Sequence, residues 1–343
     1  MSSKKIQILD VSSRDGSYAL NFQITPHNVA TIVDYLDYAG IPYIEIGHGS
    51  GLGFSKLGYP SAASNLEYAH AAKVMKKKSK IGVLSPSLNL VLPELEEIAP
   101  HIDFVRFAVM PRETKKAEKL IQKSKKLNLE VFVQLSRASL LNPEELLEEA
   151  KKAENMGVNV VYIVDTIGNF TPESTKAYFS TLKNKIHTPL GFHAHNNLGL
   201  ANINALTAIE EGCEWVDACM QGVGRQSGNT QLETIASLLE KKGYRTELNI
   251  PLLLDVAETI IKDIFQNTIK GASAFEIRSA LANIDMYPEP IFRKLALALG
   301  YTLDELIQQI SEIKNFVTLD ESHIKLLAKK AGRTYSEVIQ MLQ

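Results

Sequence analysis

Short apolar runs alternate with amphipathic stretches through the first two thirds of the chain. The runs are rich in Val, Ile and aromatic residues and lack a polar alternation, as parallel strands buried on both faces do. They predict strands over Ile6–Val11, Tyr43–Gly47, Ile81–Leu84, Phe104–Val109, Glu130–Gln134, Val160–Val164, Leu190–His193 and Trp215–Met220. Eight strand–helix units predict a (β/α)8 barrel, the TIM barrel. A doubly wound open sheet is the alternative, because alternation alone does not close a sheet.

Helix-start signals divide the chain into two parts. In the first part a capping side chain precedes a proline at three positions, Thr25, Asn142 and Thr171. Strand signals stop near residue 245. Beyond it, three threonines each stand three residues before a glutamate, the pattern of a capping box: Thr302, Thr318 and Thr334. We therefore expect a barrel over residues 1–245 and a helical C-terminal domain over residues 246–343.

Charge and composition narrow the class of protein. The 37 Lys and Arg residues nearly balance 39 Asp and Glu residues, which leaves no basic excess for binding nucleic acid. Two cysteines cannot form a disulfide framework, and no stretch approaches the roughly 20 apolar residues of a membrane span. These features predict a soluble, cytoplasmic protein with no nucleic-acid or membrane partner.

Polar residues collect where the predicted strands end, which is where a (β/α)8 barrel carries its active site. They are Arg14, Asp15, Glu45, His48, Arg106, Asp165, His193, His195 and Asn229. His193 and His195 are two apart, so both side chains face the same side of an extended strand. Two imidazoles and a carboxylate suit a divalent metal, and Asp15 is the nearest carboxylate in a closed barrel. The alternative is one buried and one surface histidine without a ligand.

The charged residues around this pair have two interpretations. Arg14 beside a metal would stabilise an oxyanion or enolate, or it would form a structural ion pair. Glu45 and Asp165 are expected as buried partners of Arg14 or Arg106. The glycines at 222, 224 and 228 do not have dinucleotide-binding spacing, and we expect a tight loop whose Asn229 caps the next helix.

Several motifs together resemble one superfamily. They are Arg14-Asp15-Gly16-Ser17, Ile44-Glu45-Ile46-Gly47-His48-Gly49, His193-Ala194-His195-Asn196-Asn197-Leu198, Glu210-Glu211-Gly212-Cys213, and Gly228-Asn229 followed by Leu232-Glu233. This set resembles the DRE-TIM metallolyases, which include HMG-CoA lyase and the isopropylmalate and homocitrate synthases. Within that superfamily it is most similar to the 4-hydroxy-2-oxovalerate aldolases, through nearly the whole chain.

The resemblance implies a carbon–carbon lyase that depends on a divalent metal, Mn2+ or Mg2+, with Co2+ and Zn2+ as further options. Asp15, His193 and His195 would bind the ion, and the residue matching Asn229 approaches it in some relatives. A 2-oxo acid would chelate the metal, Arg14 would stabilise the metal-bound enolate, and pyruvate and an aldehyde would form. Tyr287 matches a family tyrosine that reaches the site.

The family also implies partners. Its helical tail docks an acylating aldehyde dehydrogenase, so the same role is expected of residues 246–343. The small 2-oxo acid is the substrate, and a homo-oligomer is compatible with the sequence.

One departure concerns the base. The aldolases carry a histidine directly after Arg-Asp-Gly-Ser, assigned to the substrate hydroxyl, and this chain has Tyr18 there. Tyrosine, with a pKa near 10, is a poor base at neutral pH. Three groups could then take the proton of the substrate hydroxyl: Tyr18 with a lowered pKa, His48 or a metal-bound water. Alternatively, the reaction differs from that of the aldolases. Tyr18 could also be only a wall of the substrate pocket.

A Claisen-type synthase that joins an acyl-CoA to a 2-oxo acid is the second hypothesis, because the Gly222–Glu233 pattern also fits that branch. Residues 221–229 contain no cysteine, which argues against HMG-CoA lyase activity.

Overall fold

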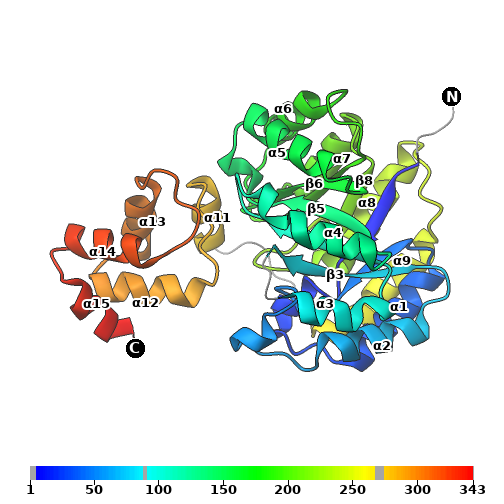
Figure 1. The fold of residues 1–343 in the computed structure, drawn as a ribbon, viewed down its shortest axis with the longest axis horizontal. Coiled ribbons are helices and arrows are strands. Elements are labelled where there is room, and N and C mark those ends of the chain that lie inside the picture. The colour runs from blue at the N-terminus through cyan, green and yellow to red at the C-terminus, as the bar shows by residue number, and fades with distance from the viewer. Residues whose placement is uncertain (1–4, 88–90, 267–273, 343) are drawn as a thin grey trace. The chain divides into compact units, whose positions relative to one another are not determined.

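The computed structural model describes residues 5–87, 91–266 and 274–342. The chain divides into two compact units, Met1–Gly271 and Ala272–Gln343 (Figure 1). This division lies later than the predicted boundary at 245. The reason is hydrophobic: side chains of the first helices after residue 245 belong to the core of the barrel, namely Ile250, Leu253, Val256, Ile261 and Phe265.

Eight parallel strands close into a barrel in sequence order. They are β1 (Gln7–Asp10), β2 (Tyr43–Ile46), β3 (Lys80–Pro86), β4 (Phe104–Val109), β5 (Glu130–Leu135), β6 (Val160–Asp165), β7 (Leu190–Ala194) and β8 (Trp215–Ala218). Strand β1 pairs with both β2 and β8. The predicted TIM barrel and its eight strands are confirmed, and the open sheet is excluded.

Helices follow the strands and surround the barrel (Figure 1). They are α1 (Pro26–Tyr38), α2 (Asn65–Met75), α3 (Leu92–Ile98), α4 (Glu118–Lys126), α5 (Pro143–Asn155), α6 (Pro172–Leu182), α7 (Ala201–Glu210), α8 (Leu232–Lys241), α9 (Ile250–Val256) and α10 (Lys262–Phe265). A short 3-10 helix, η1 (Gly16–Leu20), follows β1. The predicted caps are confirmed, since each side chain accepts a hydrogen bond from the backbone three residues on: Thr25, Asn142 and Thr171.

The second unit contains five helices among its described residues: α11 (Ala274–Leu281), α12 (Glu289–Leu299), α13 (Leu303–Ser311), α14 (Glu321–Lys330) and α15 (Tyr335–Leu342). It has its own hydrophobic core, with Phe292, Leu295 and Leu306 among its members. This confirms a helical C-terminal segment.

Two of the three capping boxes predicted for this segment form, at Thr302 and Thr334. The prediction of a capping box at Thr318 is wrong. Helix α14 begins at Glu321, and the side chain of Asp320 accepts the backbone N–H of His323 at 2.9 Å. Asp320 is itself a strong cap at the residue next to the helix, so Thr318 lies outside it.

The barrel interior changes from aromatic to charged along the strands. Phe132 stacks between Phe104 and Tyr162, with ring centroids 5.3 and 6.3 Å apart. Arg106 lies two residues beyond Phe104 on β4, so it faces the same interior one step nearer the C-terminal end of the barrel. Aromatic packing therefore supports a polar layer above it.

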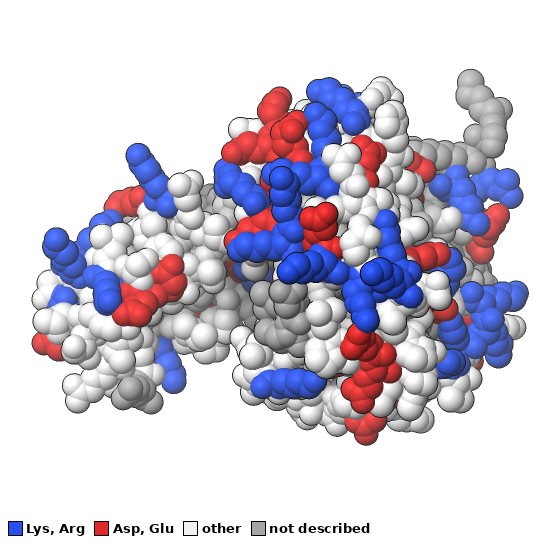
Figure 2. All heavy atoms as spheres, viewed as in Figure 1, with Lys and Arg blue, Asp and Glu red and all other residues white. Residues whose placement is uncertain are grey.

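Basic and acidic side chains lie intermixed over the visible face of the first unit, in keeping with the near-zero net charge (Figure 2). Across the described residues, none of the helices has the length and apolar character needed to cross a membrane.

Candidate metal centre

The turn after β1 holds Asp15 by both of its carboxylate oxygens. Oδ2 accepts a hydrogen bond from Arg14 Nη1 at 2.7 Å, and Oδ1 accepts one from the backbone N–H of Arg225 at 2.9 Å. The side chain is almost fully buried. Burial opposes its ionisation, but Arg14 and then the His195 and His193 rings outweigh burial, so the pKa of Asp15 lies below its usual range. Asp15 is therefore a carboxylate at neutral pH.

His193 on β7 and His195, just beyond its end, lie next to Asp15. Their alternation along the strand puts both rings on one side, with centroids 5.0 Å apart. One ligand atom each from Asp15, His193 and His195 lies within 4.8 Å of the others, and all three residues are buried. His193 Nε2 is 3.6 Å from Asp15 Oδ2. The structure thus brings the three predicted metal ligands together.

Asp217, on β8, orients the first histidine. Its Oδ2 is 2.8 Å from His193 Nδ1. A carboxylate oxygen can only accept, so Nδ1 carries the hydrogen, and Nε2 is turned toward Asp15. Burial raises the pKa of Asp217, but Arg106 and His193 lower it by more, so the net shift of this pKa is downward. Sequence reasoning missed Asp217. The available signal was an acidic residue in a run otherwise buried on both faces.

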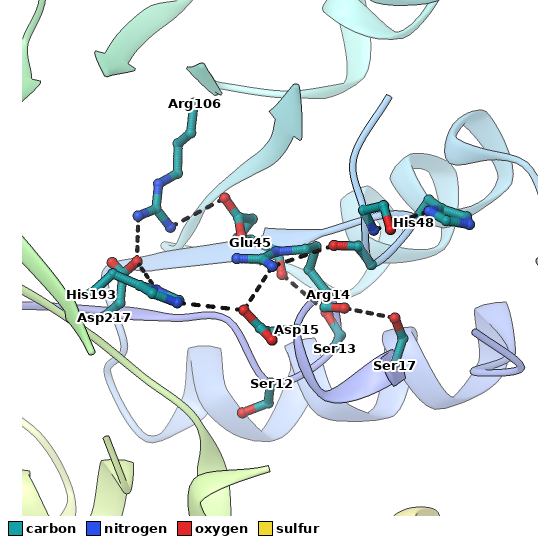
Figure 3. Close-up of polar contacts among 12 residues, drawn as sticks. Ser12, Ser13, Arg14, Asp15, Ser17, Glu45, His48, Arg106, His193 and Asp217 are labelled. Atoms are coloured by element: carbon teal, nitrogen blue, oxygen red, sulfur yellow. Dashed lines mark hydrogen bonds and ion pairs between the residues drawn. The ribbon is translucent and has the colours of Figure 1, made fainter. Parts of the chain in front are cut away.

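Six side chains form a closed series of contacts, which we call the charged ring (Figure 3). Its members, in order, are Arg14, Asp15, His193, Asp217, Arg106 and Glu45. Arg14 Nε donates to Glu45 Oε1 at 2.5 Å, and Arg106 Nη1 donates to Glu45 Oε2 at 3.1 Å. Arg106 Nη2 donates to Asp217. Glu45 and Arg106, predicted as neighbours of the site, therefore connect its two sides.

The donor set fits a divalent cation. Nδ1 of His195 and Oδ1 of Asn229 are buried and have no hydrogen-bond partner among the described residues. The charged ring also places three carboxylates around these donor atoms. Burial lowers the pKa of His195 to about 3, which leaves a neutral imidazole able to bind metal at neutral pH.

Asn229 does not cap the following helix, contrary to the sequence prediction. Helix α8 begins at Leu232, preceded by Gln231. Asn229 pairs with His195 through an isolated β-bridge, and its Nδ2 donates to Cys219 Sγ at 3.2 Å and to the Val223 carbonyl at 3.3 Å. The loop after β8 bends back toward the metal site instead of leading straight into the helix.

A cavity of about 110 Å³ adjoins the predicted ligands. Its lining residues are Arg14, Asp15, Tyr18, Leu84, Ala108, Gln134, Ser136, Val164, Thr166, His193, His195 and Arg225. Sequence reasoning did not single out Gln134, Ser136, Thr166 or Arg225. The three neutral ones lie at or just beyond strand ends, and that position was the available signal.

Tyr18 and His48 have different surroundings. Tyr18 lines the cavity, and its hydroxyl lies 3.1 Å from Ser50 Oγ. Burial raises its pKa above the usual value. His48 does not line the cavity. Its Nδ1 accepts the Ser50 N–H at 3.1 Å, so Nε2 carries the hydrogen and donates to the Pro60 carbonyl at 3.0 Å. Both nitrogens of His48 thus organise the loop after β2.

Asp165 and Tyr287 lie apart from the charged ring. Asp165 ends β6, and its two oxygens accept the backbone N–H groups of Asn169 and Phe170, each at 3.0 Å. Burial raises its pKa to about 7. It therefore shapes the turn after β6 and does not pair with either arginine. Tyr287 belongs to the second unit, and its reach to the site stays a prediction.

A closed eight-stranded parallel barrel with a carboxylate, two imidazoles and an arginine at its C-terminal end defines a TIM-barrel enzyme of the metal-dependent class. Comparison with known proteins names the family. The model described as HMGL-like matches residues 106–260. The chain belongs to the HMGL-like family, and the predicted class of enzyme, a carbon–carbon lyase, is confirmed.

Its relatives cover most of the chain. An oxaloacetate decarboxylase of Mycobacterium tuberculosis is 33% identical over 307 residues, 89% of this chain and 90% of its own. A 4-hydroxy-2-oxovalerate aldolase of Rhodococcus jostii is 37% identical over 337 residues, 97% of each chain. Among solved structures, the carboxyl transferase domain of Rhizobium etli pyruvate carboxylase superposes with a TM-score of 0.79 at 16% identity. That match covers 98% of this chain and 62% of the other, and at this identity it shows the fold alone.

Proposed function

We propose that the protein is a divalent-metal-dependent aldolase that cleaves a 4-hydroxy-2-oxo acid to pyruvate and an aldehyde. The observation that carries the proposal is the buried group of Asp15, His193 and His195 beside Arg14, at the edge of a small cavity. Further support comes from relatives named 4-hydroxy-2-oxovalerate aldolase, one of which is similar along nearly the whole chain. The reverse reaction, addition of pyruvate to an aldehyde, uses the same groups.

Asp15, His193 and His195 would hold the metal, with Asn229 Oδ1 close by. The bound ion would act as a Lewis acid toward the carboxylate and 2-oxo group of the substrate. We propose Mn2+ or Mg2+ in the cell, because both accept a carboxylate and leave positions for substrate oxygens. Co2+ and Zn2+ are further ions to test at this donor set.

Arg14 would stabilise negative charge on the C2 oxygen of the substrate. It lines the cavity, and its guanidinium is held in place by Asp15 and Glu45. In cleavage the C4 hydroxyl loses its proton, the electron pair of the C3–C4 bond moves to form the enolate, and the aldehyde leaves. C3 then takes a proton to give pyruvate. A preorganised guanidinium at the developing charge is the usual form of such stabilisation.

The remaining walls would orient the substrate. Gln134, Ser136 and Thr166 offer neutral hydrogen-bonding groups for the carboxylate of the 2-oxo acid, and Leu84, Ala108 and Val164 give the cavity its apolar surface. The cavity is small, so a substrate of few carbon atoms fits best.

Tyr18 is the cavity residue that we place opposite the C4 hydroxyl. Because burial raises its pKa, the phenol stays protonated at neutral pH and cannot readily accept the proton, and the ring of His48 is held in its own loop. We therefore expect aldol cleavage at pH 7 to be slow and to accelerate as the pH rises toward the pKa of the phenol.

Decarboxylation of a 2-oxo dicarboxylic acid is the second candidate. The observation that favours it is Tyr18: loss of CO2 from C4 breaks a bond next to C3 without removal of a hydroxyl proton, so no strong base is needed. One relative is named an oxaloacetate decarboxylase. Arg14 and the metal ligands would serve this reaction in the same way, since it also passes through the enolate of pyruvate.

The experiment uses full-length protein loaded with Mn2+. It is offered 4-hydroxy-2-oxopentanoate, oxaloacetate, or acetyl-CoA with a 2-oxo acid, and pyruvate, aldehyde, CO2 and free thiol are measured. Aldehyde and pyruvate in equal amounts support the aldolase. CO2 above the metal-only rate, without aldol cleavage, supports the decarboxylase. Thiol release alone supports the Claisen-type synthase and overturns both.

An acylating aldehyde dehydrogenase is a proposed partner, which would consume the aldehyde. The second unit exposes Leu281 and Leu297, 72% and 74% accessible, and we propose that these side chains contact the partner. Co-elution of the two enzymes in gel filtration tests the association, and the same run reports any homo-oligomer. Substitution of both leucines by Gln should abolish co-elution, whereas unchanged co-elution would contradict this surface.

A further inference from the structure

Arg106 contacts none of the proposed metal ligands, yet it supports two of them indirectly. Its side chain has no exposed surface. Nη1 donates to Glu45 Oε2 at 3.1 Å, and Nη2 donates to Asp217 Oδ2. The two carboxylates come from β2 and β8, the two strands that flank β1. One guanidinium thus joins two strands that do not pair with each other.

Each of these carboxylates also holds a residue of the metal site. Asp217 does so with the oxygen that accepts from Arg106, and Glu45 does so with its other oxygen. Asp217 Oδ2 also accepts from His193 Nδ1 at 2.8 Å. Glu45 Oε1 accepts from Arg14 Nε at 2.5 Å, and Arg14 in turn holds Asp15. Without Arg106, both carboxylates would be buried beside fewer cations, and their side chains would reorient to recover hydrogen bonds.

The shape of the guanidinium matters here as well as its charge. Its Cζ lies over the ring of Tyr162, 4.4 Å from the centroid, a cation–π contact that helps to hold the guanidinium in place. A lysine ammonium in this space would supply the same charge from a single nitrogen, without the fixed fork that reaches two carboxylates.

We infer that Arg106 is a positioning residue that sets the affinity of the metal centre by holding Asp217 on His193 and Glu45 on Arg14. The inference rests on the metal centre of the proposed function. Loss of the hydrogen-bonded support of a metal-binding histidine typically weakens metal binding 10- to 100-fold. We expect a loss of that order when Arg106 no longer holds the ring.

The experiment measures Mn2+ binding to full-length, metal-free protein by electron paramagnetic resonance, with no substrate present. Arg106→Lys should raise the Kd for Mn2+ by about 10- to 100-fold. Asp217→Asn, which keeps the shape but weakens the support of His193, should raise the Kd in the same direction. Glu45→Gln, which acts through Arg14, should change the Kd less than Asp217→Asn. The Asp217→Asn variant also keeps the inference testable where Arg106→Lys fails to fold.

The matched control is Asp37→Asn. Asp37 is a buried carboxylate that holds backbone N–H groups of residues 77–79, and it has no contact with the charged ring. Its loss should lower the Tm and leave the Kd for Mn2+ within about twofold, which is close to experimental error. The inference is overturned if Arg106→Lys folds and binds Mn2+ as tightly as the wild type, if Asp217→Asn does so, or if Asp37→Asn weakens binding equally. Absence of Mn2+ binding by the wild type would overturn the metal centre itself, and this inference with it.

Discussion

His193 Nδ1 lies 2.8 Å from Asp217 Oδ2, and this contact gives the two nitrogens of the ring different tasks. Nδ1 donates into the barrel interior, and Nε2 faces Asp15. His195, just beyond the end of β7, has no hydrogen-bond partner at its Nδ1 among the described residues. Asp217 therefore orients the ring of His193, whereas no side-chain hydrogen bond at Nδ1 orients the ring of His195.

Both histidines should be required for metal binding. We predict that His193→Ala and His195→Ala each abolish Mn2+ binding and activity while the barrel stays folded, because both side chains lie near the C-terminal end of β7 and outside the hydrophobic core. Mn2+ should raise the Tm of the wild type, since a ligand of the folded state stabilises it. Differential scanning fluorimetry with and without Mn2+ measures this. The control is His27→Ala, on the exposed face of α1, which should keep the full shift. A retained shift in either site variant would exclude these ligands.

Tyr18→His should increase aldol cleavage. A histidine at this position would bring an imidazole with a pKa near 6.5 to the cavity, in place of a phenol whose pKa burial raises. A well-placed general base contributes roughly 10²- to 10⁴-fold, so we expect kcat/KM at pH 7 to rise at least tenfold. The pH profile should also change from one that climbs above pH 9 to one that levels off near pH 7. Lower activity in Tyr18→His would show that the phenol itself takes part in the reaction.

Gly228 is needed for the loop that carries Arg225 to Asp15. Its φ is +83°, and a Cβ there would lie 1.9 Å from the carbonyl oxygen of Gly222. Gly228→Ala must therefore displace the loop, and the hydrogen bond from the Arg225 N–H to Asp15 would be lost with it. We predict a lower Tm and a weaker Mn2+ affinity. Gly243→Ala is the matched control, because its φ is also positive and no atom lies within 4 Å of the added Cβ. Equal losses of Mn2+ affinity in both variants would contradict a specific role for the loop.

Asp37 should make stability depend on pH. Its Oδ1 accepts the N–H groups of Lys77, Lys78 and Ser79 at 3.0, 2.8 and 2.6 Å. Burial raises the pKa of Asp37, but these hydrogen bonds lower it more, so the folded-state pKa is below the unfolded value. The stabilisation is therefore complete above the unfolded pKa near 4 and is lost as the pH falls through the folded value.

Asp37→Asn should accordingly cost about 1–3 kcal/mol at pH 7. The difference from the wild type should shrink below pH 4. Urea unfolding at pH 7 and pH 3 measures both values. A difference that is the same at the two pH values would rule out the ionised form as the source of the stabilisation.

Much of the fold and the three metal ligands could be predicted because their signals are local. The eight strands are continuous apolar runs, and the His193–His195 spacing places both rings on one side of a strand. Arg14 and Asp15 follow the first strand directly. Because all eight strands of the barrel are parallel, the C-terminal ends of β1 and β7, and the residues at those ends, lie at the same end of the barrel.

What could not be predicted depends on contacts between strands. Asp217 looks like an isolated acid in an apolar run until β8 is placed next to β7 and opposite β4. Asp165 has the same appearance in sequence, but the loop that follows folds back and occupies its oxygens. Asn229 precedes a helix in sequence, yet its loop turns toward His195. The role of each of these three residues depends on contacts with residues that are distant in sequence or on the path of the following loop.

The decisive experiment on the proposed aldolase activity is pyruvate release from 4-hydroxy-2-oxopentanoate by Mn2+-loaded protein. With lactate dehydrogenase and NADH as the coupled detector, we expect pyruvate and an equal amount of acetaldehyde. Release should be lost on chelation, restored by Mn2+, and lacking in His195→Ala. Pyruvate formation that survives chelation and His195→Ala, or no formation from any 4-hydroxy-2-oxo acid between pH 7 and pH 10, would exclude a metal-dependent aldolase.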